Sequence, residues 1–581
     1  MSTPSSFRLF CRLLLLPLAG LLGASTLGTL EATGQDVQNL PKQKPFTIRG
    51  SLAAGLTYYH AEGISGRRQP FSWYVSGAPV ITLYGIVIPF SLVVSEQESR
   101  FSQPFNQYGV SPYYKWVKLH LGYRNIRFSN YTLGGANFLG AGIELTPGRW
   151  RLGYVYGQFN RGVAEDSTTY NGRRQYVRPT YRRVGFGAKL GFGSAQNYAD
   201  LLVFKATDDL SSIAAPSRRS FITPMENVAV GLRSQFSFFK QSLTFDLDLG
   251  ASLLTRNLLL GPTNPRLGLP DRRELIWLNE SSAFFTAGQL SVNYRARAGS
   301  LGVTYQRIDP DYQSLGAYFF QNDVEQLTLN PTLQLAGGRL SVSGSWGVSR
   351  DNLNGLRSRT TRRTVSAATI GYVPTPTLQL NLNYSNFGTG QGRGVGDVFN
   401  DSLAVSVVNA SYGGSVAWRL GNRQLSHALM LTGTVQQTDD QNQFTRQYAA
   451  ASSQLGTCTY TLAWPAKFLT VSAVGSYVGL STYGRNTQAI GGSLNLSRQW
   501  LKGRVRATVN QTMQTRTLDG QPDGLFSSTG LSFALRPAER SRQTLTLNSN
   551  YLYNRYQAGA DGSVFRNFTE LRGNVLYGIS F

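Results

Sequence analysis

Apolar and polar side chains alternate at a period of two residues along most of this chain, from about residue 46 to its end. Residues 243–249 read LTFDLDL, and the same alternation recurs in 340–348, 378–384 and 545–553. This period is typical of β-strands with one apolar and one polar face. A helical membrane protein is excluded, because each spanning helix needs about 20 consecutive apolar residues and the mean hydropathy is only −0.20. We therefore expect an all-β chain.

The connections between these strands alternate between short and long. The short ones lie at 146–149, 191–197, 239–242, 297–300, 336–339, 373–377, 420–423, 464–467, 501–503 and 536–541. Tight turns at one end and long polar loops at the other are typical of a transmembrane antiparallel up-and-down β-barrel. These hairpins give about twenty strands between Phe138 and Tyr556. With 46–60, 71–95, 112–128 and 565–581, the prediction is about 24 strands, an even number, with about 22 or 26 as the alternatives.

One stretch, residues 77–94, is apolar enough to imitate a spanning helix. Pro79 and Pro89 lie within it, and many of its residues are β-branched, so a strand is favoured. We count 71–95 as a single crossing, because a second crossing would make the strand number odd. Three arrangements remain open for this region: a bend at Gly85, a projection beyond the membrane, or an inward fold that makes part of 61–111 lumenal or plug-like.

The N-terminus predicts export. A basic start, about a dozen apolar residues and a small-residue exit make residues 1–34 a secretory signal peptide, with cleavage after Gly34. Residues 35–45 are then a short periplasmic segment, and residues 46–581 form the barrel. Cys458 is the one cysteine of the mature chain, so no internal disulfide can form. A segment this short holds no separate plug domain, which argues against siderophore-type import.

The last residues read ELRGNVLYGISF. Val575, Tyr577, Ile579 and Phe581 share one face of the final strand. This end resembles the C-terminal recognition strand of outer-membrane barrels, which the barrel-assembly machinery reads. The resemblance implies that the chain is integral to a bacterial outer membrane. The alternative is a secreted β-sandwich or β-helix, but sandwiches lack the alternation of short and long connections.

A second resemblance covers residues 67–163. The runs RRQPFSWYVSGAPVITLYGIVIPFSLVVSEQES and PYYKWVKLHLGYRNIRFSNYTLGGANFLGAGIELTPGRWRLGYVYGQFNRGV look like a group of large, uncharacterised outer-membrane barrel proteins of Bacteroidota. This resemblance implies location and fold. It implies no activity and no catalytic residues.

No pattern of catalytic or metal-binding residues emerges. The histidines His60, His120 and His427 are isolated from one another in the sequence, which is unlike the ligand spacing of a zinc site. Acidic pairs at 208–209, 309–311 and 439–440 fall in predicted external loops and lack EF-hand spacing, so solvated loop charge is favoured over Ca²⁺ binding. We expect no catalytic site, no metal and no cofactor. An enzyme in the barrel wall is a distant alternative.

The charge of the chain is strongly positive. Lys and Arg total 56 against 31 acidic residues, which gives a net charge of +25. Six arginines alternate with apolar residues and are predicted to line the lumen, because charge on the lipid face costs about 2–4 kcal/mol at mid-membrane. They are Arg233, Arg295, Arg297, Arg504, Arg506 and Arg572. A basic lumen favours anions. The competing interpretation is that these arginines neutralise lumenal acids, since a turn at 240–241 would place Arg233 opposite Asp248.

Further basic clusters fall in predicted loops. They are Arg173, Arg174 and Arg178; Arg218 and Arg219; Arg272 and Arg273; and Arg357, Arg359, Arg362 and Arg363. Because arginine binds phosphate oxygens in a bidentate manner, we expect contact with outer-membrane lipid and lipopolysaccharide. Export and the barrel pattern argue against a nucleic-acid partner.

Two functions from different classes remain. The first is a channel or translocation pore with an anion-favouring, Arg-lined lumen, because a barrel of this strand number encloses a wide lumen. The second is a surface scaffold or secretion-associated barrel that binds a partner protein without open-pore transport.

Overall fold

The computed structural model describes residues 45–65, 67–95, 107–170, 173–217, 220–261, 277–317, 321–395, 402, 404–422, 424–538, 541–556 and 567–581. The predicted signal peptide and residues 35–44 lie outside the described residues. Within the described part of the chain, no helix is both long and apolar enough to cross a membrane.

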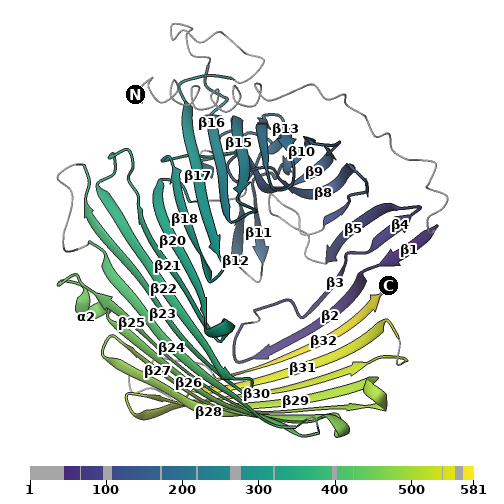
Figure 1. Ribbon diagram of the computed structural model, residues 1–581, viewed down its shortest axis with the longest axis vertical. Coiled ribbons are helices and arrows are strands. Elements are labelled where there is room, and N and C mark those ends of the chain that lie inside the picture. Colours follow the sequence, from purple (N-terminus) through teal and green to yellow (C-terminus); the bar gives the residue numbers. More distant parts are fainter. Residues whose placement is uncertain are drawn as a thin grey trace.

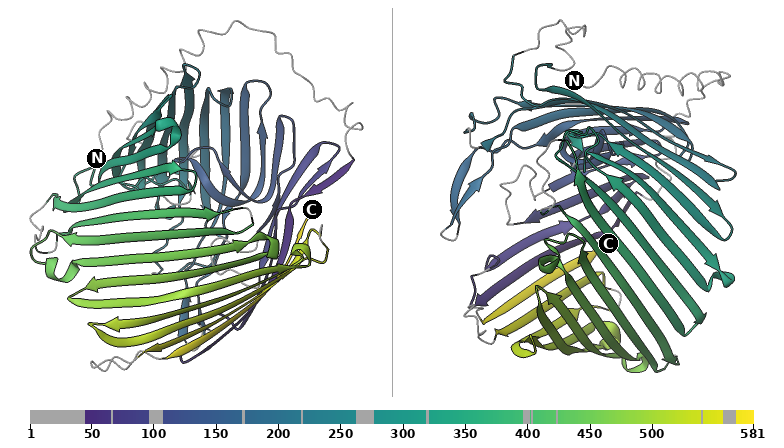
Figure 2. Two further views of the ribbon diagram at one scale, coloured as in Figure 1. Left: turned by 60° about the horizontal axis from the view of Figure 1, so that its bottom comes forward. Right: turned by 90° about the vertical axis from the view of Figure 1, so that its left-hand side faces the viewer.

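The strands form one closed antiparallel sheet (Figure 1). Among the described residues the ring contains 26 wall strands, if β6 and β7 are taken as one interrupted strand. The ring closes where β2 pairs with β32, from Ser51 opposite Ser580 to Glu62 opposite Thr569. Figure 2 shows the barrel from two further sides, with the green strands and the blue strands forming different walls.

The wall strands have the following bounds. They are β2 (Ser51–Glu62), β3 (Phe71–Gly77), β5 (Ile86–Ser95), β6 (Gln107–Val110) with β7 (Tyr113–Tyr114), β8 (Val117–Arg127), β9 (Leu133–Leu145), β10 (Trp150–Asn160), β13 (Arg182–Gly193), β14 (Tyr198–Asp209), β15 (Glu226–Phe238), β16 (Leu243–Thr255), β17 (Ser282–Ala296), β18 (Gly299–Ile308), β20 (Val324–Leu335), β21 (Leu340–Arg350), β22 (Arg359–Thr375), β23 (Leu378–Arg393), β24 (Ser406–Gly421), β25 (Ser426–Asp440), β26 (Ala451–Trp464), β27 (Leu469–Thr482), β28 (Arg485–Trp500), β29 (Val505–Leu518), β30 (Gln521–Leu535), β31 (Gln543–Tyr556) and β32 (Phe568–Ser580).

Short elements complete the structure. They are β1 (Phe46–Arg49), β4 (Val80–Leu83), the hairpin of β11 (Asp166–Tyr170) and β12 (Arg173–Val177), β19 (Gly316–Ala317), the single-turn helices η4 (Ala336–Gly338), η6 (Pro465–Lys467) and η7 (Leu501–Gly503), and α2 (Arg446–Ala449). Three of the helical turns, η4, η6 and η7, make tight connections between neighbouring wall strands.

The predicted hairpins are confirmed. All ten predicted short turns connect consecutive antiparallel wall strands at one end of the barrel, here called the turn end; the opposite end is the loop end. At 239–241 the backbone has positive φ at three successive residues, which makes the tight reversal between β15 and β16. This turn places Arg233 opposite Asp248, as the sequence predicts.

The strand count is corrected near the N-terminus. Residues 71–95 are not one crossing: β3 and β5 are both wall strands, and β4 forms a hairpin with β5 through the positive-φ pair Tyr84 and Gly85. Residues 107–114 supply a further crossing, so the number stays even. Of the arrangements left open for this region, the chain does reverse near Gly85, but it does so as a hairpin between paired strands.

The two faces of the wall follow from the register, because directly paired residues point to the same side. On one face, large apolar side chains stay exposed, for example Leu382, Ile490 and Leu494. On the other face, segments 128–132 and 309–317 fold against the wall, and β19 pairs with β9 in parallel. A segment enclosed by a barrel can contact only its inner face, so this second face lines the lumen.

The buried apolar core lies between the wall and these inward segments. Phe138, Phe204 and Leu254 are fully buried on the inner face of β9, β14 and β16. A second cluster contains Tyr131 and Tyr312, whose rings pack edge to face. On one side of the lumen, the barrel wall is therefore thickened by a packed apolar core.

Candidate functional site: the barrel lumen

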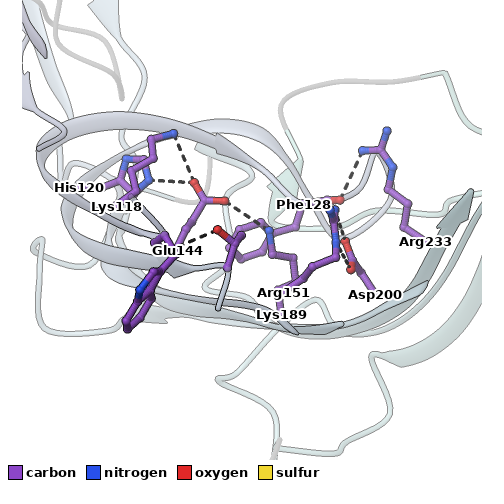
Figure 3. A network of polar contacts seen from close by, with 10 residues as sticks. Lys118, His120, Phe128, Glu144, Arg151, Lys189, Asp200 and Arg233 are labelled. Carbon is purple, nitrogen blue, oxygen red and sulfur yellow. Dashed lines mark hydrogen bonds and ion pairs between the residues drawn. The ribbon is translucent and has the colours of Figure 1, made fainter. Parts of the chain in front are cut away.

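Beside this core, the inner face of β8–β10 and β13 carries a cluster of charged groups (Figure 3). The carboxylate of Glu144 on β9 accepts from His120 Nε2 at 3.0 Å. Lys118 Nζ and Lys189 Nζ lie 3.4 and 3.3 Å from its oxygens. Because positions on paired strands face the same side, the carboxylate on β9 is surrounded by three donors from two other strands, β8 and β13. Glu144 therefore neutralises only part of the positive charge of Lys118 and Lys189.

Two bidentate ion pairs flank this cluster. Arg151 on β10 donates to both oxygens of Asp200 at 2.7 and 2.9 Å. Arg183 on β13 donates to both oxygens of Asp208 at 2.7 and 3.0 Å. Both aspartates are buried, so these pairs hold the wall together and contribute little free charge to the lumen.

The carboxylate of Asp248 on β16 fixes the first inward segment. It accepts from the Ser129 hydroxyl and from the Asn130 backbone N–H at 3.0 Å. Arg233 lies directly opposite Asp248 and donates through Nη1 to the Phe128 carbonyl at 3.5 Å (Figure 3). The competing interpretation from the sequence, that Arg233 balances lumenal acid, agrees with this position between Asp200 and Asp248.

Both inward segments are tied to each other as well as to the wall. Tyr312 Oη donates to the Tyr131 carbonyl at 2.6 Å, and Ser314 Oγ donates to the Thr132 carbonyl at 2.5 Å. Asn227 on β15 accepts from the Leu315 N–H at 3.1 Å. These contacts make the two segments one unit, here called the inner shelf, which occupies part of the lumen.

The wall from β21 to β31 differs in character. Its inner face carries mostly small neutral polar side chains, among them Ser343, Asn381, Asn383, Ser411, Ser415, Thr432, Thr434, Thr457, Ser472, Ser476, Ser493, Asn495, Thr508, Asn510, Ser528, Ser532, Asn548 and Asn550. Hydroxyl and amide groups hydrogen-bond to water and to polar solutes without strong charge selection. The lumen therefore has one densely charged side and one mostly neutral polar side, on which charged residues such as Arg363 and Arg506 are interspersed.

The six arginines predicted to line the lumen occupy two kinds of position. Arg233, Arg295, Arg506 and Arg572 have the register of the inner face, through pairing with Asp248, Ser300, Gln499 and Asn550 respectively. Arg297 and Arg504 instead lie in connections at the turn end. Arg504 Nε donates to the Arg536 carbonyl at 3.5 Å, so it braces the neighbouring turn.

The histidines do not come together. His120 Nδ1 lies 3.0 Å from Ser111 Oγ on the inner face, while His427 Nδ1 lies 2.5 Å from Tyr460 Oη and His60 lies 3.3 Å from Glu62. Within the described residues, no three His, Cys, Asp or Glu side chains are grouped closely enough to hold a metal ion.

The C-terminal residues close the barrel. Val575, Tyr577 and Ile579 point to the outer face, opposite Leu56, Ala54 and Leu52 of β2. The Phe581 N–H donates to the Gly50 carbonyl at 2.9 Å. Their recognition by an assembly machinery stays a prediction.

Sequence reasoning missed Lys118, Glu144, Lys189, Arg151 and Asp200. Their alternation with apolar neighbours was the signal that could have placed them on the inner face.

No family model matches the chain, and no curated protein matches it.

Several solved structures align with parts of this chain. OpdK of Pseudomonas aeruginosa, crystallised with vanillate, aligns with 12% identity and a TM-score of 0.30 over 62% of this chain and 93% of that chain. OccAB4 of Acinetobacter baumannii aligns with 11% identity and a TM-score of 0.29 over 74% and 97%. OccAB3 of the same species aligns with 13% identity and a TM-score of 0.30 over 62% of this chain and 93% of that chain.

Proposed function

We propose that this chain is an integral outer-membrane β-barrel that acts as a channel or translocation pore and favours anions. The observation that carries the proposal is the unequal charge of the inner face. In the described part of the chain, Arg295, Arg506 and Arg572 face the lumen and form no ion pair with a carboxylate. Lys118 and Lys189 share the single carboxylate of Glu144.

The orientation follows from the connections. In transmembrane barrels the short turns face the periplasm and the long loops face outward. The turn end is therefore the periplasmic end, and the loop end with the β11–β12 hairpin is extracellular. The exposed apolar outer face is the surface that contacts lipid.

The neutral wall is as important for conduction as the charged one. A pore must attract its solute strongly enough for entry and release it easily enough for exit. Lumenal arginines raise the local concentration of anions through their field. The Ser, Thr and Asn side chains of β21–β31 offer weak, replaceable hydrogen bonds along which a hydrated solute can move.

The inner shelf favours the second candidate. A lumen partly filled by segments 128–132 and 309–317 is also what a scaffold or secretion-associated barrel would have, with a partner protein bound at its loops. The two functions differ in one measurable property, which is the permeability of the purified barrel to small solutes.

Uptake by proteoliposomes tests the proposal. Three sugars of matched size are compared: a sugar acid, a neutral sugar and an amino sugar. We expect the acid to enter fastest, and the combined change Arg295→Gln, Arg506→Gln and Arg572→Gln to abolish that order. Arg498→Gln is the matched control, because Arg498 lies on the outer face over the Trp500 ring. Impermeable liposomes that contain folded barrel would favour the scaffold.

A further inference from the structure

A row of charged residues crosses four neighbouring strands on the outer face, near the loop end. Arg307 on β18 is paired with Glu325 on β20, Glu325 with Arg350 on β21, and Arg350 with Arg362 on β22. Directly paired residues point to the same side of a sheet. This row of four, here called the arginine row, therefore forms one continuous strip outside the lumen.

Glu325 organises the row but does not neutralise it. Its carboxylate accepts from Arg350 Nε at 2.6 Å and from Tyr305 Oη at 2.7 Å, and Arg307 Nη1 lies 3.7 Å away. Two guanidinium groups thus share one carboxylate, and Arg307 also lies 3.9 Å from Asp309. Arg362 adds a third guanidinium next to Arg350, so the strip has a net positive charge. Arg350 and Arg362 are both exposed.

Two other outer-face pairs near the loop end are balanced. Lys205 lies 3.4 Å from Glu226, and Arg182 forms an ion pair with Asp209. The arginine row differs from these pairs in its positive excess. The sequence placed Arg359, Arg362 and Arg363 in an external loop, but they belong to β22, where Arg362 faces outward and Arg363 faces inward.

The height of the row corresponds to the edge of the apolar band. β21 runs for 11 residues from Leu340 at the turn end to Arg350. At about 3.3 Å per residue and a strand tilt of about 40°, Arg350 stands about 25 Å above the turn end. The apolar band of such barrels is also about 25 Å tall, and the cost of outer-face arginine falls toward its edges. The row thus lies at the level of the outer-leaflet headgroups.

A groove lies directly beside the row. It has a volume of about 390 Å³ and is lined in part by Tyr305, Leu327 and Val348, which face outward, together with Arg350 and Arg362. Its outward-facing floor is mainly apolar, and its upper rim carries Arg350 and Arg362 together with the carboxylate of Glu325. This combination fits an amphiphile whose acyl chain points down along the wall and whose anionic head lies above it.

We propose that the arginine row binds a phosphate group of an outer-leaflet lipid, and that the groove receives the adjoining acyl chain. Guanidinium groups bind phosphate oxygens in bidentate geometry, and Glu325 holds Arg350 in place for this contact. The site is separate from the lumen and independent of transport through it.

Equilibrium binding to the folded full-length barrel in detergent, measured by native mass spectrometry, tests the proposal. The probes are bisphosphorylated lipid A, its dephosphorylated form and inorganic phosphate. We expect R350Q/R362Q to weaken lipid A binding about 30-fold, as the loss of two basic contacts to an anionic lipid surface predicts. The dephosphorylated lipid is expected to bind the original chain and the variant equally.

R498Q is the matched control, since it removes an outer-face arginine at the turn end, outside the lining of the groove, and is expected to leave lipid A binding unchanged. R362Q alone, at a residue outside the Glu325 contacts, is a second variant that preserves the row's internal pairing. Equal lipid A affinity in R350Q/R362Q and the original chain, an equal loss in R498Q, or inorganic phosphate binding as tightly as lipid A would each overturn the proposal. None of these outcomes depends on solute permeability.

Discussion

Replacing Asp248 by alanine is expected to release segment 128–132 from the inner wall. The carboxylate of Asp248 accepts from Ser129 Oγ and from the Asn130 N–H. A hydrogen bond to a charged group contributes about 1.5–3 kcal/mol, so losing two lowers the free energy of local opening by about 3 kcal/mol or more. Every 1.4 kcal/mol is a factor of ten, which makes the open state of the segment about 100-fold more populated.

Hydrogen–deuterium exchange measured by mass spectrometry on a peptide that covers 126–134 reports this opening directly. Asp246→Ala is the control: Asp246 lies on the same strand and the same inner face, opposite Gln235, and it loses the same charge. We expect about 100-fold faster exchange in Asp248→Ala and unchanged exchange in Asp246→Ala. Equal exchange rates in the two variants would show that the Asp248 carboxylate does not hold segment 128–132 against the inner wall.

Two further outcomes follow from the wall itself. Asp200→Asn leaves the Arg151 guanidinium without its buried partner, so we expect the free energy of unfolding in urea to fall by about 3 kcal/mol. Asp519→Asn, which removes one partner of an exposed ion pair with Arg485, should lower it by less than about 1 kcal/mol. Equal losses in the two variants would contradict the buried role of Asp200. Cys458 points to the outer face and Thr457 to the inner face. In a bilayer, a water-soluble maleimide should therefore leave Cys458 unlabelled but should label Thr457→Cys in a Cys458→Ser background. The reverse labelling pattern would invert the assignment of the two faces.

The strand alternation and the turns made the regular part of the barrel predictable. From β9 to β31, apolar and polar side chains alternate along each strand and a recognisable turn bounds it, so the alternation and the turn residues predict the same strand boundaries. Between residues 71 and 114 they do not. β4 has only 4 residues and β3 has 7, and the run from Val80 to Val94 is apolar on both faces. Alternation cannot reveal a reversal inside such a run, so the sequence left three arrangements open there, and the hairpin at Tyr84–Gly85 was not among them.

The lumen was predictable only where it depends on alternation. The inner-face positions of Arg233, Arg506 and Arg572 follow from local pattern. The inner shelf does not, because Ser129 and Asp248 are 119 residues apart and meet only after the ring has closed. The arginine row is similar: Glu325 and Arg350 lie in separate strands, and their alignment depends on register.

The reversal potential of the purified barrel in a planar bilayer under a salt gradient tests the central claim most directly. We expect a steady conductance whose reversal potential is anion-selective and moves toward zero when Arg506 and Arg572 are both changed to glutamine. Correct folding is checked by the heat-dependent shift in gel mobility. A folded barrel that conducts no ions, or that selects cations, would rule out an anion-favouring channel.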